Sequence, residues 1–387
     1  MAVDYYNLDD VLGDEYLLIR AATRAFIEKD IAPVMDSYAQ AHEPIPDLMR
    51  KLGDIGALGP FIPTEYGGAG LDYMAYGLIM QELEAGDSAI RSAASVQSSL
   101  VMFPIYTFGS EEQKRKYLPL LGKGEYIGAF GLTEPNHGSD PAHMETKLLR
   151  DGTNKGYILT GTKMWITNAP ICDVAVVWAK DEAGKVRGVI VERQDAGFST
   201  PEIANKWSLR ASLTGELVFD QVHITEDRLL PGVSSMRGPL SCLNSARYGI
   251  AWGAIGAAID CYRIALQYAL ERKQFGKAIA SFQLQQKKLA EMLTEITKAQ
   301  LLVWRLGQLR NTNKATPQQI SMAKRNNVYM ALQVARDARQ LLGAMGIVGD
   351  YPIMRHMMNL ESVITYEGTH DIHLLITGQD ITGISAF

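Results

Sequence analysis

Cysteine is scarce in this chain, and its positions follow no disulfide or metal-binding pattern. The three cysteines are Cys172, Cys242 and Cys261, and no Cys-x-x-Cys spacing occurs. An odd number without such spacing argues against a disulfide framework and a zinc cluster, and it fits a reducing compartment. A disordered or collagen-like composition is also absent, because 47% of the 387 residues are hydrophobic and 21% are charged. This length predicts two or three folded domains, enough to enclose a dry cavity.

A basic surface, a targeting segment and a long apolar run are missing as well. The net charge of -5 offers no basic face, so we expect no nucleic-acid partner. The first residues, MAVDYYNLDDVLGDEY, are acidic and unlike an export signal or transit peptide, which favours a cytoplasmic protein, or the mature mitochondrial matrix form in a eukaryote. The most apolar run, residues 249–259, has 11 residues. This is too few to cross a bilayer, so we predict no membrane span.

Common nucleotide-binding motifs are absent too. No G-x-G-x-x-G follows an expected strand, and no G-x-x-x-x-G-K-[ST] occurs anywhere. Neither a Rossmann site nor a P-loop is therefore supported. If the chain binds a dinucleotide, another arrangement must hold it.

The hydrophobic period divides the chain into three regions. Residues 1–122 follow a helical period, and Ser110 with Gln113 has the pattern of a capping box. Residues 123–237 change to short alternating or β-branched runs, such as GYILTGTKMWITN and VAVVWAK, separated by turn signals. Residues 238–387 return to long helical patterns. We therefore expect a mainly α protein with a central β domain, a small barrel or sandwich.

The long helical patterns of the third region predict an antiparallel four-helix bundle, because short connections join them. One helix carries clear boundary signals. Thr316 is expected to be its N-cap, with Pro317 as the first helical residue and Gln319 closing the cap. Gly346 is expected to end this helix.

A short stretch near the C-terminus, TYEGTHDIHLL, gathers several chemically active side chains. Glu367 and His370 have the E-x-x-H spacing of di-iron carboxylate bundles, and Glu134 and His137 repeat it. The second pair lies in a loop interrupted by proline and glycine, and a di-iron site needs further inward glutamates. We predict no metal, which leaves an acid–base site or a solvated helix end.

Four stretches together resemble the acyl-CoA dehydrogenase family of flavoproteins: FGLTEPNHGSD, KMWITNAP, ERKQFGKAIASFQLQQ and TYEGTHDIHLL. The resemblance covers essentially the whole chain. It implies a helical domain (1–122), a β domain (123–237) and a C-terminal helical bundle (238–387). Within the family it is closest to the glutaryl-CoA dehydrogenases, through DSAIRSAASVQSSLVMFPIYTFGSEEQ, SLRAS and CLNSARYGIAWG.

The resemblance implies an FAD-dependent oxidation of a CoA thioester. Glu367 matches the family's catalytic base, which takes the proton next to the thioester while a hydride leaves the next carbon for the flavin. A buried carboxylate suits this task because desolvation raises its pKa toward that of the activated proton. The backbone N–H of the same glutamate would bind the thioester oxygen, and Gly368 would allow a close approach.

The resemblance also assigns positions to FAD, some in the β domain and some in the bundle. These are Phe130, Leu132, Thr133, Ser139, Trp165, Ile166, Thr167, Arg272, Phe275, Gln283, Gln340, Gly343, Thr369 and Phe387. In this family the bundle groups come partly from a neighbouring subunit, so the resemblance implies at least a dimer and usually a homotetramer. Ala344 departs from the glycine expected at its position.

Substrate choice is implied by Arg91 and Ser92. A glutaryl chain ends in a carboxylate that must be paired when it is buried, and Arg91 would be its partner. Glu84 lies seven residues earlier, about two helical turns, so it shares a face with Arg91 and can orient the guanidinium. The positions matched to the rest of the substrate are Ser139, Leu243, Asn244, Arg247 and Gly368.

Loss of CO2 after the oxidation is associated in this group with a tyrosine directly before the base, here Tyr366, and with a glutamate at the place of Glu84. The resemblance therefore implies conversion of glutaryl-CoA to crotonyl-CoA and CO2, with electrons passed to an electron-transferring flavoprotein. The alternatives are a short-chain acyl-CoA dehydrogenase of other specificity, a non-decarboxylating glutaryl-CoA dehydrogenase, a non-catalytic acyl-CoA-binding protein and an oxidase.

Overall fold

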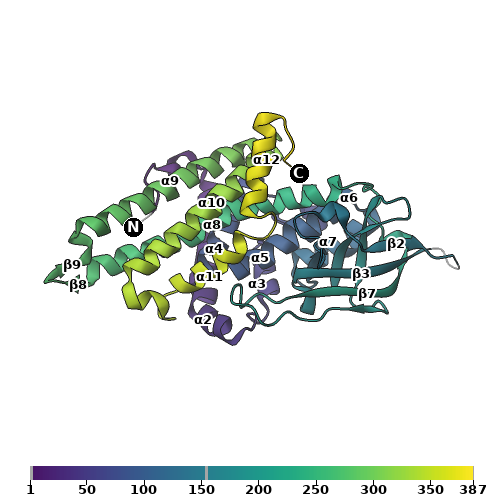
Figure 1. Ribbon diagram of the computed structural model, residues 1–387, viewed down its shortest axis with the longest axis horizontal. Helices are drawn as coiled ribbons and strands as arrows, with labels where there is room; N and C mark the ends of the chain where they lie inside the picture. The colour runs from purple at the N-terminus through teal and green to yellow at the C-terminus, as the bar shows by residue number, and fades with distance from the viewer. Residues whose placement is uncertain (1–2, 153–155, 387) are drawn as a thin grey trace.

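Helical regions precede and follow a β domain along the chain, as the hydrophobic period predicts (Figure 1). The computed structural model describes residues 3–152 and 156–386. In Figure 1 the sheet lies at the right end, the long C-terminal helices extend to the left, and the N-terminal helices lie between them. The expectation of a mainly α protein with a central β domain is confirmed.

The N-terminal region is almost wholly helical. Its α-helices are α1 (Asp14–Phe26), α2 (Ala32–Ala41), α3 (Leu48–Asp54), α4 (Tyr73–Gly86), α5 (Ser88–Ser95), α6 (Phe103–Phe108) and α7 (Glu111–Gly122). The capping box predicted from Ser110 and Gln113 is present at the start of α7. A π-helical segment, Val96–Met102, joins α5 to α6 without a break. Such segments are frequent at functional sites.

A sharp corner joins α4 to α5. At this corner the Asp87 carboxylate caps the first turn of α5 through a hydrogen bond of 2.7 Å. Its other oxygen accepts hydrogen bonds from Arg355 and Asn359 at 3.0 and 2.9 Å. The corner fixes the relative position of Glu84, in the last turn of α4, and Arg91, in the first turn of α5.

The β domain is a seven-stranded sheet with the order β1-β4-β2-β3-β7-β6, in which β5 pairs with β4. Its strands are β1 (Gly128–Gly131), β2 (Lys147–Arg150), β3 (Gly156–Thr167), β4 (Val174–Lys180), β5 (Val186–Glu192), β6 (Phe198–Ser199) and β7 (Thr214–Thr225). The register between β3 and β7 shifts between Lys163 and Ile166, and Trp165 within this irregularity has a φ of 62°. A bulge of this kind re-aims a side chain. The indole of Trp165 is 57% exposed, whereas Ile166 beside it is buried.

The C-terminal region is built on three long helices, α8 (Arg237–Glu271), α9 (Gln283–Asn311) and α10 (Pro317–Leu341), with α11 (Ile353–Val363) and α12 (His370–Thr382) against α10. The predicted cap of α10 is confirmed, with Thr316 as N-cap and Gln319 closing the box. The predicted end at Gly346 is wrong, because α10 ends at Leu341. Gly346 instead sits where an added Cβ would lie 2.3 Å from the Arg339 carbonyl oxygen, so close packing explains the glycine.

Helix α8 extends far beyond the apolar run that the sequence shows. By length and composition it is the one helix in the described part of the chain that is apolar enough to cross a membrane, yet 78% of its most apolar window is buried inside the protein. Its neighbours are α4 and α10, which cover its apolar side chains. A core helix has this character without any membrane.

Glycines allow α8 to cross α4 at very short range. A Cβ at Gly256 would lie 1.8 Å from the Gln81 carbonyl oxygen and 2.9 Å from the Ala85 nitrogen. A Cβ at Gly253 would lie 2.1 Å from the Glu84 carboxylate. The crossing therefore presses the backbone of α8 directly against the turn of α4 that carries Glu84.

We expect Gly256→Ala to destabilise the protein by about 3 kcal/mol or more, because the methyl group meets backbone atoms that cannot move without separating the two helices. Thermal unfolding measures the effect. Gly378→Ala in α12 is the matched control, since an added Cβ there meets no described atom within 4 Å, and it should not lower the midpoint. Equal midpoints for both variants would show that the crossing is not tightly packed.

Candidate active site

The segment between α11 and α12 has an unusual backbone at its chemical centre. Glu367 has a φ of 54° and Gly368 a φ of 98°, so two successive residues lie at positive φ. Glycine adopts this conformation freely, whereas a glutamate there is uncommon and needs support from its surroundings. Thr369 follows as the N-cap of α12 and accepts a hydrogen bond from the Ile372 amide at 3.2 Å. The turn is thus anchored directly after the glutamate.

Cationic side chains hold the three successive carbonyl groups of this segment. Arg247 of α8 donates from Nε to the Glu367 carbonyl oxygen at 2.7 Å. Lys324 of α10 donates from Nζ to the carbonyl oxygens of Tyr366 and Gly368 at 3.0 and 2.9 Å. Both cations are buried. Among the described residues, the Glu367 amide has no hydrogen-bond acceptor, so its N–H is available to a ligand.

The Glu367 carboxylate lies in a poorly hydrated place. The residue as a whole is partly exposed, but its Oε2 atom is buried without a partner among the described residues. Burial raises the pKa of this carboxyl group, and the positive charges of Arg91, Arg247 and Lys324 oppose that rise. A desolvated carboxylate with a raised pKa is suited to accept a proton from carbon.

A buried ion pair lies beside this glutamate. Arg91 donates from Nε to Glu84 Oε2 at 2.6 Å, and both side chains are 0% exposed. Ser88 donates to the other Glu84 oxygen at 2.8 Å, and Arg91 Nη2 donates to the Tyr366 hydroxyl. Although burial opposes the charge on the guanidinium, the nearby Glu84 carboxylate raises the pKa of Arg91, so it stays protonated. The Tyr366 hydroxyl accepts this bond and retains its own proton for another acceptor.

One buried polar atom of this pair, Nη1 of Arg91, has no partner among the described residues, and Oγ of Ser95 has none apart from the nearby Tyr76 hydroxyl. Unpartnered buried polar atoms are costly and call for an explanation, such as a ligand. The sequence reasoning missed Ser95 and named Ser92. Residues four apart in a helix share a face, whereas adjacent residues point roughly 100° apart. The i+4 spacing from Arg91 was the signal that points to Ser95.

Several hydroxyl groups lie close together near the Arg91–Glu84 pair. The Tyr76 hydroxyl is 2.8 Å from Ser99 Oγ, which in turn accepts from Ser245 at 3.2 Å. Burial raises the pKa of Tyr76 to about 12, so the phenol stays neutral. Ser95 also lies within reach of the same hydroxyl. These residues come from α4, α5, the π-helical segment and α8, and sequence spacing alone could not join them.

The positions assigned to the flavin ring form two adjacent backbone segments. The Met164 amide donates to the Thr133 carbonyl at 2.9 Å, and buried Lys163 donates to the Leu132 carbonyl at 3.1 Å. Lys163 also pairs with Glu134 at 2.8 Å, which ties the two segments together. The exposed indole of Trp165 projects from one of them. Phe130 and Ile166 are core side chains at 7% and 4% exposure, so they offer backbone groups rather than side-chain contacts.

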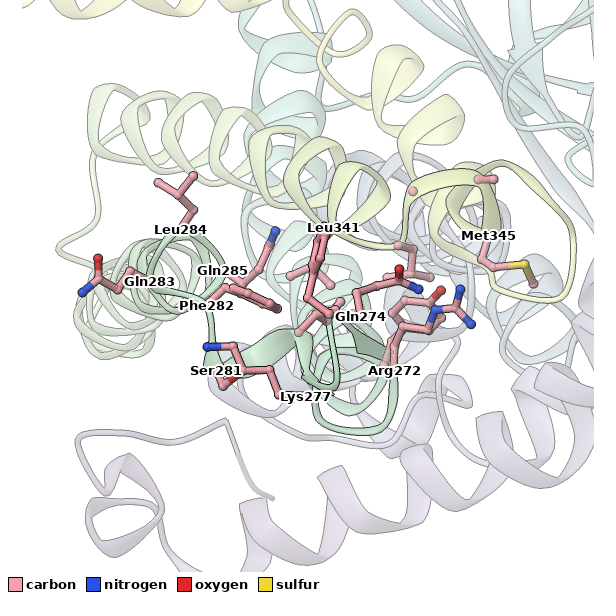
Figure 2. Close-up of a pocket in the computed structure, with 16 residues that line it drawn as sticks. Arg272, Gln274, Lys277, Ser281, Phe282, Gln283, Leu284, Gln285, Leu341 and Met345 are labelled. Carbon is pink, nitrogen blue, oxygen red and sulfur yellow. The ribbon is translucent and has the colours of Figure 1, made fainter.

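The bundle positions assigned to FAD lie elsewhere. Arg272, Phe275, Gln283 and Gly343 line a cavity of about 1070 Å³ between the α8–α9 connection and the end of α10 (Figure 2). The β8–β9 hairpin (Lys273–Gln274 and Lys277–Ala278) in this connection lies at the opposite end of the molecule from the sheet (Figure 1). One chain therefore does not bring the two sets of FAD positions together.

The remaining assigned residues have simpler surroundings. Asn244 accepts a hydrogen bond from Arg247 at 3.4 Å, and Leu243 beside it is partly buried. Gln340 accepts from Lys288 at 2.9 Å. Ser139 is exposed in the loop after β1. Phe387 lies outside the described residues.

The histidines of the segment have no metal-like arrangement with Glu367 in the described structure. His373 is 0% exposed, and burial lowers its pKa to about 2, so it is neutral. One group elsewhere, Glu134, His137 and Glu145, has ligand atoms within 4.8 Å of one another. Glu134 is already paired with Lys163, so the absence of a metal remains our prediction.

Comparison with known proteins gives one consistent family. Three family models match: the N-terminal domain of acyl-CoA dehydrogenase over residues 13–125, the middle domain over 129–222 and the C-terminal domain over 236–382. A crystal structure of glutaryl-CoA dehydrogenase from Mycobacterium smegmatis is 50% identical, with a TM-score of 0.96 over 98% of this chain and 97% of that one. A second, from the same organism and in complex with FADH2, is 45% identical with a TM-score of 0.97 over 99% and 98%. The short-chain specific acyl-CoA dehydrogenase of Bos taurus is 34% identical over 94% of this chain and 89% of its own length.

We expect Arg91→Gln to cost about 3–5 kcal/mol of folding stability, because it leaves the Glu84 carboxylate buried without its cation. The double variant Glu84→Gln/Arg91→Gln should recover part of this loss. Arg115→Gln is a matched control, since its pair with Glu111 is exposed, and its effect should be within about 1 kcal/mol. Urea unfolding measures all three, and a single Arg91 variant as stable as the control would contradict the burial argument.

Proposed function

Because the chain belongs to the acyl-CoA dehydrogenase family, we propose that it oxidises glutaryl-CoA and then decarboxylates the product to crotonyl-CoA and CO2. The acyl-CoA dehydrogenase family establishes the general reaction, the oxidation of a CoA thioester. The choice of glutaryl-CoA and the second step are our proposals. The observation that carries them is the unpartnered Arg91 guanidinium nitrogen beside Glu367.

FAD is the cofactor, and the site fits it. The exposed Trp165 indole projects beside the joined segments around Thr133, where a flat aromatic ring can pack against it. The separate cavity at Arg272 and Gln283 offers cationic and amide groups suited to the nucleotide end. When bound, FAD supplies the acceptor for the hydride that leaves the substrate's β-carbon.

Glu367 is the residue we assign to proton abstraction. Its desolvated carboxylate takes the α-proton, and the electron pair left on the carbon is delocalised into the thioester carbonyl. The unoccupied Glu367 amide can donate to that carbonyl oxygen, which strengthens the acidity of the α-proton. Arg247 and Lys324 fix the backbone from which both groups project.

The surroundings of Arg91 suit an anionic end of the acyl chain. Arg91 stays protonated, and its Nε and Nη2 atoms already donate to Glu84 and Tyr366. Its Nη1 atom is buried and has no acceptor among the described residues. A terminal carboxylate on the substrate would supply that acceptor and the opposite charge.

The neighbourhood of that carboxylate also supports the second step. After oxidation the carboxylate can leave as CO2, because its electron pair is delocalised through the new double bond into the thioester. The proton held by Glu367 then returns to carbon, which balances the reaction. Tyr366, hydrogen-bonded to Arg91 and neutral because burial raises its pKa, stands between the base and the guanidinium.

The electron acceptor, assembly and location complete the proposal. We assign an electron-transferring flavoprotein as acceptor and the cytoplasm, or the mitochondrial matrix in a eukaryote, as the location. We assign an assembly of at least two copies, because the two sets of FAD positions lie at opposite ends of one chain, and a homotetramer is the form that the family resemblance implies.

A short-chain acyl-CoA dehydrogenase is the second candidate, since the bovine short-chain enzyme is similar over most of both chains. A plain acyl chain, however, would leave the buried Arg91 Nη1 without an acceptor among the described residues.

Anaerobic addition of glutaryl-CoA should bleach the flavin absorbance, and mass spectrometry should find crotonyl-CoA and CO2. In Arg91→Gln the KM for glutaryl-CoA should rise roughly 10- to 100-fold, because a charged hydrogen bond is lost, while that for butyryl-CoA should change little. Arg115→Gln, at an exposed pair, is the control for a changed arginine.

Each alternative gives a different result in the same experiment. Bleaching by butyryl-CoA but not glutaryl-CoA would identify the short-chain enzyme. Accumulation of glutaconyl-CoA without crotonyl-CoA would identify a non-decarboxylating enzyme. Hydrogen peroxide release would identify an oxidase, and a colourless protein would identify a non-catalytic one.

The pH dependence of kcat/KM should show an acid limb above the ordinary glutamate pKa of about 4.3. Glu367 must be deprotonated to act, and burial raises its pKa, so activity falls as the pH drops through that raised value. Glu367→Gln should remove nearly all activity while FAD stays bound. A limb at or below the ordinary glutamate value would show that the carboxylate is well hydrated.

A further inference from the structure

Lys324 contacts the segment that carries the proposed base, but no step of the proposed reaction is assigned to it. It lies on α10, is 1% exposed, and carries its ammonium between the two carbonyl groups that flank Glu367. Long cationic side chains usually reach water with their charged end, so a fully enclosed ammonium is costly unless its donors are satisfied. Here both recorded acceptors are backbone carbonyls of the segment that carries the base.

The geometry points to Lys324 as a positioning residue for the base, on the premise that the proposed function is correct. By holding the Tyr366 and Gly368 carbonyls at once, it keeps Glu367 at positive φ, with its carboxylate and its free amide both directed to the substrate. We propose that without this ammonium the segment relaxes and proton abstraction slows, while the substrate still binds.

Hydrogen bonds from two helices alternate along the carbonyl groups of residues 366–368, and together they fix the backbone of this segment. Lys324 holds the carbonyls of residues 366 and 368 from α10, and Arg247 holds the carbonyl of residue 367 from α8. The intervening peptide planes are therefore fixed from two helices. A glutamate at a φ of 54° is sparsely populated in free chains, so it persists only where its surroundings over-determine it.

The two helices are themselves tied together close to Lys324. Asn327, three residues further along α10 and 0% exposed, donates to the Ala251 carbonyl of α8 at 2.9 Å. Ala251 lies four residues beyond Arg247 on the same helix. The two helices that hold the Glu367 segment through Lys324 and Arg247 are therefore fixed to each other. Precise orientation of a catalytic group requires such support.

The charges that face Lys324 fit this role. Burial has the largest effect and lowers the pKa of Lys324 to about 7. The negative charges of Glu367 and Glu84 favour its protonated form, whereas Arg247 and Arg91 disfavour it. Burial lowers the pKa values of His373 and His370, and the charge of Lys324 lowers both further.

The test separates proton abstraction from binding and from hydride transfer. With the flavin reduced beforehand, hydride transfer is blocked, and the base can still exchange the α-hydrogens of a bound acyl-CoA for deuterium from D2O. In Lys324→Met this exchange should fall about 100-fold, the scale expected for a misplaced catalytic group. The dissociation constant for the acyl-CoA and the FAD content should change little.

Two variants serve as comparisons. Ser321→Ala changes a buried residue one turn earlier on α10 and should leave the exchange rate unchanged. Lys324→Arg keeps a charged donor and should recover part of the rate. Exchange in Lys324→Met close to that of Ser321→Ala would overturn the proposal, and so would an equal loss in binding and exchange.

If Lys324→Met does not retain FAD, Lys324→Ala with added methylammonium replaces it. Recovery of exchange as methylammonium is raised supports the proposal, and no recovery in a folded, FAD-loaded variant counts against it. The experiment uses whichever acyl-CoA reduces the wild-type flavin. A failure of glutaryl-CoA as substrate would therefore sink the proposed function while leaving the role of Lys324 testable with butyryl-CoA.

Discussion

The burial of several opposite charges around one turn is the constraint on which this structure depends. Glu84 and Glu367 share a closed space with Arg91, Arg247 and Lys324. Each charge is expensive in such a place unless partners surround it, so the helices that carry them cannot shift independently. Among the described residues, the pairing leaves two atoms without a hydrogen-bond partner, Oε2 of Glu367 and Nη1 of Arg91. A bound substrate can interact with these two atoms.

The helical scaffold serves this cluster in specific ways. The corner capped by Asp87 fixes the end of α4 relative to the start of α5. Gly253 of α8 lets the backbone of that helix approach the Glu84 carboxylate. Helix α10 contributes through Lys324 and Asn327. The site is therefore assembled from four helices and one irregular turn, and its precision comes from close backbone packing.

The β domain contributes a different kind of order. An irregularity in β3 turns the Trp165 indole out of the sheet, while the Lys163–Glu134 pair beneath it joins two backbone segments. FAD is longer than the region around the Trp165 indole and needs further binding groups. The cavity at Arg272 lies at the other end of the molecule, so one chain does not bring the two sets of FAD positions together.

The sequence by itself determined the order of the regions and both capping boxes, and through family resemblance it predicted Glu367 as the base. These features follow from local periodicity, local hydrogen bonding and recognisable motifs. It misplaced the end of α10 at Gly346, because packing against Arg339 rather than helix termination requires that glycine. Ser95 and Lys324 emerged only from the tertiary structure. Their meaning rests on which buried atoms meet across helices distant in sequence, and a linear pattern does not contain those distances.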